Sequence, residues 1–507
     1  MMNRWYGKIK PPFHLLIPLV LIAFVIITIP LELVFEFDSD EGVNLIKAIL
    51  VADGLRLYQD IWSDQPPFFT FILALWLKLF GHSIFAARFL VLLFASLLVW
   101  CFYQTLRLEL GVIAAAAGTL ILVNSHNFVR LSGSVMIGIP ALALGMLAVY
   151  TLHLGQQRAS KILIFTSGVC LALSMQTKLF TLFLIPLLCL QLLYFSGAKN
   201  QVNFRSRLTN MALWLLGLGS IYCLVGLVSG SFSYEQLLQG HLESKQLGNV
   251  FGTKFFTFSY LLNHMFGQDY LFFFLALGGV VAIVTQKQKS GFLPLAWFGL
   301  ACALLASHKP VWYHHYPLIT IPLAWLGAYG FASILTWLGQ LKTSGLQLKK
   351  NILPLLMALV SFAAVGLETH RFVGNRNKYY LKLPEQQGKL ELLTLVRRYQ
   401  QQTKWFFTDK PVYAFYTGLS IPPEISVLTM KRVLTGQISY GEILSFIKIY
   451  QPEQILLSRF KDEMEEYEPM RNYLEQNYFK IYENDDLGID YYLFKPLATN
   501  TEAVVEL

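Results

Sequence analysis

The feature that most constrains this chain is a series of long apolar segments in its first 370 residues. A helix needs about 20 apolar residues to cross the hydrocarbon core of a bilayer. Because 55% of the residues are hydrophobic and only 14% are charged, we expect an α-helical polytopic membrane protein with about 11–13 transmembrane helices. The expected spans lie near residues 13–36, 84–106, 111–127, 134–154, 162–177, 179–195, 209–229, 269–286, 291–306, 317–338 and 351–367.

Basic residues recur in every second loop between these spans. The positive-inside rule makes that side cytoplasmic. The N-terminus is then cytoplasmic, and the first loop, the loop 230–268 and the tail after residue 368 lie outside. We expect a multi-pass protein of the plasma (inner) membrane, whose basic excess reflects topology and not a nucleic-acid partner. The basic loops contain Lys8, Lys10, Arg107, Arg158, Lys161, Lys199, Arg205, Arg207, Lys287, Lys289, Lys342, Lys349 and Lys350.

One apolar segment, residues 66–81, is too short to cross the bilayer on its own. Counting it as a span would move every later loop to the opposite side of the membrane. We therefore interpret it as a re-entrant or membrane-lying helix that Pro66-Pro67 begins and Gly81 ends. It would be a true span if another short segment were also one.

The chain divides into a transmembrane domain, residues 1–370, with its first outer loop at 37–65, and a tail, residues 371–507. The tail alternates helical patterns, such as 389–402 and 442–449, with short β-type runs, such as 405–408 and 455–458. This alternation predicts a small extracytoplasmic α/β domain.

Acidic residues concentrate in the first outer loop. Residues 1–370 contain 13 Asp and Glu, and eight of them lie between Glu32 and Asp64. Carboxylates beside hydrocarbon are costly and indicate a functional site. Within the run Asp38-Ser39-Asp40-Glu41, Asp38 and Glu41 have the spacing of a capping box, which begins a helix over about 42–53. The alternative is a general base or a set of cation ligands, and the motif alone does not separate the two.

The order of motifs in this loop resembles the GT-C superfamily of integral-membrane glycosyltransferases, most closely its protein O-mannosyltransferase and aminoarabinose-transferase branch. The Asp40-Glu41 pair is followed by a G-x-x-x-Y-x-D element, here Gly54 to Asp60, and by Gln65-Pro66-Pro67. Gln176-Thr177-Lys178 and His315-Tyr316 resemble later family elements. In the family a lysine precedes Pro-Pro, so Gln65 implies that one phosphate contact is absent or moved.

The resemblance implies an enzyme that moves a sugar, a hexose or a pentose, from a polyprenyl-phosphate carrier to an acceptor hydroxyl on the outer face of the membrane. The acceptor is a protein, a lipid or a glycan, and membrane lipid surrounds the enzyme. It implies Asp40 as the base of an inverting, mannosyltransferase-like reaction, since one carboxylate suffices. Glu41 would orient Asp40 or bind the acceptor, and Asp38 is the second candidate for the base.

Cations on the outer face are candidates for the carrier phosphate. These are Lys178, Arg130 and Lys309, although Lys178 and Arg130 also fit basic residues that snorkel from span ends. Further candidates for the substrate pocket are Asp60, Asp64, Gln65, His241, His308, His314, His315 and Tyr316. The aromatic and histidine run 308–316 equally fits an aromatic belt. No cofactor is certain, and a divalent cation stays open.

A second class of function is a lipid-linked glycan transporter or polymerase. A transporter would place ionisable groups at mid-span. The acids of this chain lie in an outer loop instead, which favours the transferase.

Overall fold

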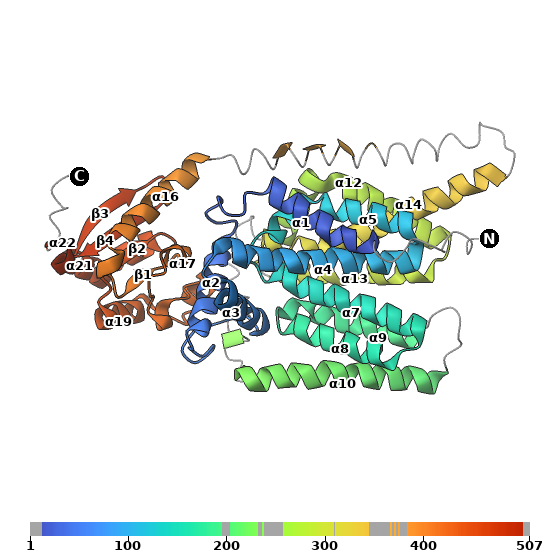
Figure 1. Ribbon diagram of the computed structural model, residues 1–507, viewed down its shortest axis with the longest axis horizontal. Coiled ribbons are helices and arrows are strands. Elements are labelled where there is room, and N and C mark those ends of the chain that lie inside the picture. Colours follow the sequence, from blue (N-terminus) through green and yellow to red (C-terminus); the bar gives the residue numbers. More distant parts are fainter. Residues whose placement is uncertain are drawn as a thin grey trace.

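A computed structural model describes residues 13–194, 203–231, 236–237, 257–308, 310–343, 363, 366–367, 370–371, 374–375 and 383–499. Its transmembrane part is a bundle of helices, and the tail forms a separate layer at one end of the bundle (Figure 1). The bundle helices are α1 (Leu16–Thr28), α4 (Ile84–Leu110), α5 (Val112–Val123), α6 (His126–Ser132), α7 (Gly138–Arg158), α8 (Lys161–Met175), α9 (Leu184–Tyr194), α10 (Phe204–Ser229), α12 (Phe258–Thr285), α13 (Phe292–Ser307) and α14 (Pro317–Thr343).

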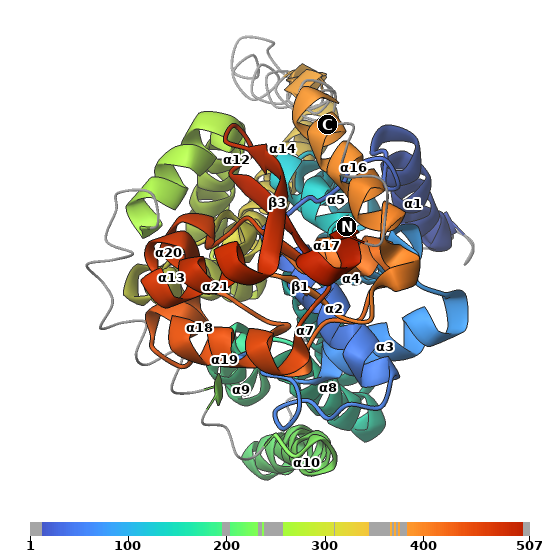
Figure 2. The same ribbon diagram turned by 90° about the vertical axis from the view of Figure 1, so that its left-hand side faces the viewer.

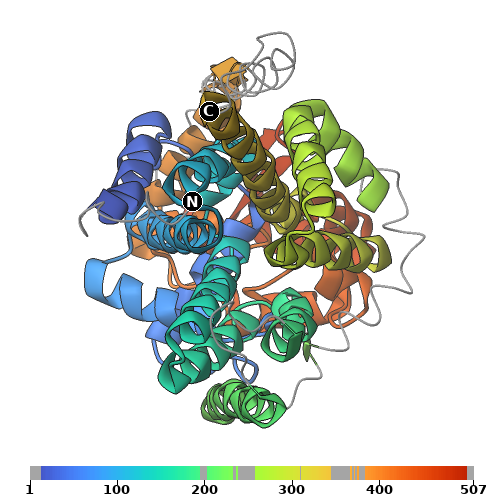
Figure 3. The same cartoon turned by 90° about the vertical axis from the view of Figure 1, so that its right-hand side faces the viewer.

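The predicted spans and the observed helices agree closely. Each predicted span except 351–367 contains a described helix, and that last segment lies almost entirely outside the described residues. Within the described part, five helices are long and apolar enough to cross a membrane, or up to seven if two bent pairs each count as one span. The bent pairs are α5 with α6, at 79°, and the two parts of α12, at 95°. The interior of the bundle contains α7 and α14, whereas α10 lies at its edge (Figure 3).

The short apolar segment forms α3 (Phe68–Phe80), which begins after Pro67 and ends at Gly81, as predicted. Gly81 has a φ of 82°, a conformation that favours glycine. A helix of 13 residues is about 20 Å long, which is less than the hydrocarbon core. It packs against α2 (Ser39–Ala52) at the end of the bundle that faces the tail (Figure 1).

The tail is an α/β domain, as predicted, with a four-stranded sheet in the order β1-β2-β4-β3. The strands β1 (Phe406–Thr408) and β2 (Gln454–Leu457) are parallel, and β4 (Ile489–Phe494) is antiparallel to β2 and to β3 (Tyr478–Asn484). Its helices surround the sheet (Figure 2). They are α16 (Leu383–Arg398), α17 (Val412–Thr417), α18 (Met430–Leu434), α19 (Tyr440–Tyr450), α20 (Lys461–Glu466), α21 (Glu468–Asn477) and α22 (Lys495–Thr499).

The tail domain docks on the first outer loop through a shared hydrophobic cluster. Phe35 and Val43 of the loop pack with Val412 and Tyr413 of the tail. A close approach lies at Gly42, where a Cβ atom would lie 2.5 Å from the Val412 nitrogen. Glycine at this position therefore lets α17 lie directly on α2, and it fixes the tail above the loop that carries the acids.

Candidate active site

A cavity of about 670 Å³ lies where the first outer loop, the bundle and the tail meet. One part of its wall is apolar and includes Leu304, Leu305 and Leu318 of α13 and α14. The remainder is rich in charge, with acids from the first loop and cations from the bundle and the tail. The charged residues of the lining are Glu36, Asp38, Asp40, Lys47, Asp64, Arg130, Lys178, Lys431 and Arg459, with His308, His314 and His315.

The local fold of the first loop points Asp40 into this cavity. Asp38 has an extended conformation and is the N-cap of α2, and its Oδ1 accepts a hydrogen bond of 2.9 Å from the Asp40 nitrogen. The helix then carries Asp40, Asn44 and Lys47 at positions i, i+4 and i+7, which lie on one face. All three line the cavity.

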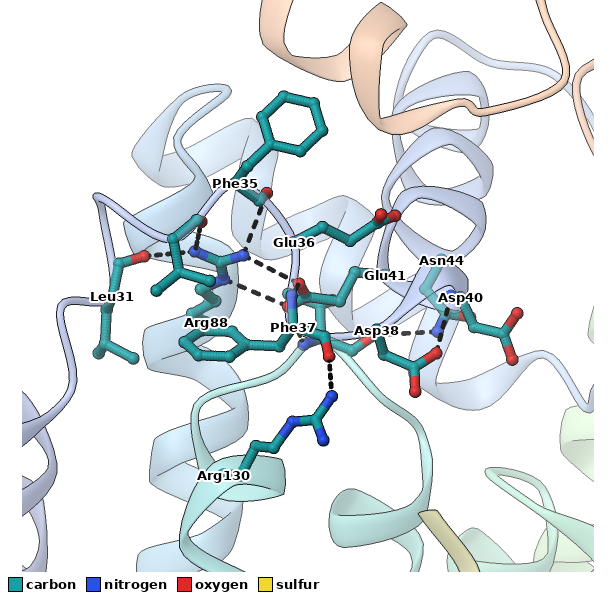
Figure 4. A network of polar contacts seen from close by, with 12 residues as sticks. Leu31, Phe35, Glu36, Phe37, Asp38, Asp40, Glu41, Asn44, Arg88 and Arg130 are labelled. Atoms are coloured by element: carbon teal, nitrogen blue, oxygen red, sulfur yellow. Dashed lines mark hydrogen bonds and ion pairs between the residues drawn. The ribbon is translucent and has the colours of Figure 1, made fainter. Parts of the chain in front are cut away.

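Glu41 faces the opposite way. Its carboxylate is fully buried and forms an ion pair with Arg88, with Oε2 2.9 Å from Nη2. It also accepts hydrogen bonds of 2.7 Å from the backbone nitrogens of Phe37 and Val135. Figure 4 shows Glu41 turned towards Arg88, while Asp38 and Asp40 point away from that pair. The interpretation of Glu41 as a residue that binds the acceptor is therefore corrected; Glu41 holds the loop in place.

Asp38 is held as a carboxylate. Its Oδ2 accepts a hydrogen bond from the Tyr313 hydroxyl and lies 3.9 Å from Nδ1 of His314. Burial opposes the charge, but the hydrogen bonds from His314, Tyr313 and the Asp40 backbone outweigh it and hold the pKa of Asp38 well below its usual value.

Asp40 has the opposite electrostatic environment. Burial in the cavity wall and then the negative charge of Asp38 raise the pKa of Asp40, and Arg459 and His314 oppose that rise only in part. A carboxylate with a raised pKa is the better proton acceptor. The two neighbouring acids are thus separated into a fixed anion and a candidate base.

Two predicted cations face the same cavity. Arg130, on α6, donates hydrogen bonds to the Phe37 carbonyl and, at 3.1 Å, to the Tyr313 hydroxyl. Lys178 lies in the turn after α8, with its Nζ 4.8 Å from the centre of the Phe180 ring. Burial lowers the pKa of Lys178 to about 8, against the attraction of Asp40, Asp64 and Asp38. Lys178 is therefore mostly charged at neutral pH and loses its charge as the pH passes about 8.

The structure gathers many of the residues predicted for the site. Those lining the cavity are Asp38, Asp40, Asp64, Gln65, Arg130, Lys178, His308, His314 and His315. Their chemical roles stay predictions. Lys309 and His241 lie outside the described residues.

Two pocket predictions are wrong. Asp60 forms an ion pair of 3.4 Å with the exposed Arg56, four residues earlier, and does not line the cavity. Tyr316 is buried at the start of α14, where it packs in the core of the bundle. In both cases the sequence placed the residue near the site, but the local helix or turn directs its side chain elsewhere.

Several lining residues escaped the sequence prediction. Lys47 lies on the same helical face as Asp40, and this spacing could have indicated it. The predicted helix began at about residue 42, however, and so did not include Asp40. Tyr313 lies within the predicted aromatic run. Lys431 and Arg459 belong to the tail, and nothing local in the sequence connects them with residues almost 400 positions earlier.

Comparison with known proteins agrees with this architecture. Residues 64–226 match the profile of a family described as dolichyl-phosphate-mannose-protein mannosyltransferase. The fold is similar to ArnT from Cupriavidus metallidurans bound to undecaprenyl phosphate, with a TM-score of 0.62, 12% identity and coverage of 94% of this chain and 97% of that chain. It is also similar to the oligosaccharyltransferase AglB from Archaeoglobus fulgidus in complex with an inhibitory peptide and a dolichol-phosphate, with a TM-score of 0.55, 12% identity and coverage of 96% and 75%. No curated protein sequence matches the chain.

The fold is thus that of the GT-C membrane glycosyltransferases. The profile match covers residues 64–226, which lie within the transmembrane domain, and agrees with this fold.

Proposed function

We propose that the protein transfers a sugar from a polyprenyl-phosphate carrier to an acceptor hydroxyl, with inversion at the anomeric carbon, in the cavity between the first outer loop and the tail. The observation that carries this proposal is the combination of a candidate base, Asp40, with cations and an apolar wall in one cavity. The cations suit a phosphate, and the wall of Leu304, Leu305 and Leu318 suits a lipid chain.

The chemistry needs one proton acceptor and one place for the leaving group. Asp40 takes the proton of the acceptor hydroxyl as its oxygen bonds to the anomeric carbon. The bond from that carbon to the carrier phosphate breaks, and its electron pair stays on the phosphate oxygen. Lys178 and Arg130 lie in the same wall and stabilise the anion. Asp38, held by Tyr313, raises the basicity of Asp40 through its charge.

A divalent cation is a further proposal for this site. Ligand atoms of Asp38, Asp40 and His314 lie within 4.8 Å of one another, and two carboxylates with one imidazole suit several divalent ions. A bound cation would supply positive charge beside the reacting oxygen. Transfer that stops after chelation and returns on addition of one metal ion would establish the requirement.

The proposal is tested with labelled polyprenyl-phosphate sugars added to membranes with and without the protein. Label that passes to a protein, a lipid or a glycan identifies the acceptor. Label that only crosses the membrane on its carrier would favour the alternative, a lipid-linked glycan transporter.

The tail domain should lie outside the cytoplasm. In the structure the tail and the first outer loop share one end of the bundle, and the basic residues Arg107 and Arg158 end their helices at the other (Figure 1). A reporter that is active only outside the cytoplasm, fused after Leu497, should be active. Activity of a cytoplasm-only reporter at the same position would contradict this orientation.

Lys178→Ala should raise the donor KM by about 10- to 100-fold at neutral pH, since a hydrogen bond to a charged group contributes about 1.5–3 kcal/mol. The protonated lysine binds phosphate, so the wild-type KM should rise as the pH passes about 8, the pKa of Lys178. Lys178→Arg should retain part of the activity and weaken this pH dependence, because arginine stays charged. Donor kinetics unchanged in Lys178→Ala would leave Lys178 as a snorkelling residue.

A further inference from the structure

Lys47 is a buried lysine that faces the cavity. Only 1% of its surface is exposed, yet it lines the cavity. Among the residues that the structure describes, its ammonium has no partner within hydrogen-bond or ion-pair distance; Asp64 and Asp40 attract it only from further away. Burying an ammonium without a partner is costly. A lysine kept in this position therefore indicates an anion that enters the cavity.

A second lysine reaches the same place from the tail domain. Lys431 is on α18, and its Nζ lies 3.4 Å from Oδ2 of Asp64. The same segment is anchored on the first loop at Trp62. The indole nitrogen of Trp62 donates a 3.0 Å hydrogen bond to Gln437, and the Arg432 guanidinium lies 5.2 Å from the Trp62 ring centre. These contacts fix Lys431 at the cavity.

Lys178 completes a lysine cluster, which we define as Lys47, Lys178 and Lys431 around Asp64. Burial lowers the pKa of all three lysines, and Asp64 attracts each of them. Three ammonium groups face the Asp64 carboxylate, and Asp40 adds a second negative charge near Lys47 and Lys178, so the three lysines outnumber these two carboxylates.

We propose that the lysine cluster binds the phosphate of the departing lipid carrier, with Lys47 and Lys431 as further phosphate-binding residues. This inference rests on the proposed function. The donor phosphate is a diester with one negative charge. When the bond to the anomeric carbon breaks, the phosphate becomes a monoester and gains a second charge. The ammonium groups therefore stabilise the product, with two negative charges, more than the donor, with one, and such a difference accelerates transfer.

The test measures binding of undecaprenyl phosphate to the purified full chain in detergent, with undecaprenol and inorganic phosphate as comparison ligands. Lys47→Met and Lys431→Met should each raise the Kd for undecaprenyl phosphate by about 10- to 100-fold and leave undecaprenol binding unchanged. Lys448→Met is the matched control, because Lys448 is an exposed lysine of α19 over the Tyr473 ring, outside the cavity; its Kd should equal that of the wild type.

A structural role for Lys47 would give a different result. Without ligand, Lys47→Met should keep or raise the unfolding temperature, since methionine removes a buried charge. Wild-type affinity in both variants would overturn the inference, and so would equal competition by inorganic phosphate. If Lys47→Met does not fold, Lys431→Met decides alone, because the Lys431 side chain is partly exposed. Binding through these lysines without any sugar transfer would overturn the proposed function and leave the phosphate site standing.

Discussion

Asp40→Asn should fold and insert normally but lose sugar transfer by about 100- to 10,000-fold, the usual cost of removing a general base. Asp40 lines the cavity, and burial together with the charge of Asp38 raises its pKa, which suits a group that must accept a proton. The measurement is the single-turnover rate with a labelled polyprenyl-phosphate sugar, so that product release does not hide the chemical step.

Asp38→Asn is the comparison for this result. Asp38 accepts hydrogen bonds from Tyr313 and from the backbone of Asp40, so its loss should disturb the position of the base and lower its pKa. The rate should fall less than in Asp40→Asn, and its pH profile should shift to lower pH. A rate near that of the wild type in Asp40→Asn, with a complete loss in Asp38→Asn, would assign the base to Asp38.

Glu41→Gln should destabilise the protein by about 3–5 kcal/mol, the cost of breaking a buried ion pair from one side. The Glu41 carboxylate accepts bonds from Arg88 and from the backbone at Phe37 and Val135. An amide would turn an N–H towards one of these donors and leave the Arg88 charge without compensation. The measurement is thermal unfolding of the purified protein in detergent.

Asp60→Asn is the control for that measurement. It removes an acid from the same loop, but Asp60 pairs with the exposed Arg56, and such surface pairs contribute little. Its unfolding temperature should not change. A Glu41→Gln variant that unfolds like the wild type but transfers no sugar would show that Glu41 acts in the reaction and not in the loop.

The sequence predicted the bundle and the tail domain well, because both depend on local patterns. Apolar length identifies spans, and alternating patterns identify the strands β1 and β2. It also led to Asp38, Asp40 and Lys178, since these residues lie at the ends of elements beside the membrane. The features that it missed depend on the direction of a side chain or on packing between residues that are far apart in the chain.

Glu41 illustrates the limit set by direction. It follows Asp40 directly, but successive residues on a helix point about 100° apart, and so the two carboxylates face different sides of the loop. Lys431 illustrates the limit set by packing. Its approach to Asp64 requires the tail to dock on α2, which Gly42 permits through contact with Val412. No pattern near Lys431 reports that contact.

The most direct test of the central claim is transfer of label by the purified protein in sealed vesicles whose outer face alone receives the polyprenyl-phosphate sugar. The protein inserts into the vesicles in either orientation. A protease added outside distinguishes the two orientations, because it reaches the tail domain in only one of them. Transfer that requires the tail on the side of the donor, and that Asp40→Asn abolishes, is the predicted result. Transfer with the tail on the opposite side, or transfer that persists in Asp40→Asn, would contradict the account.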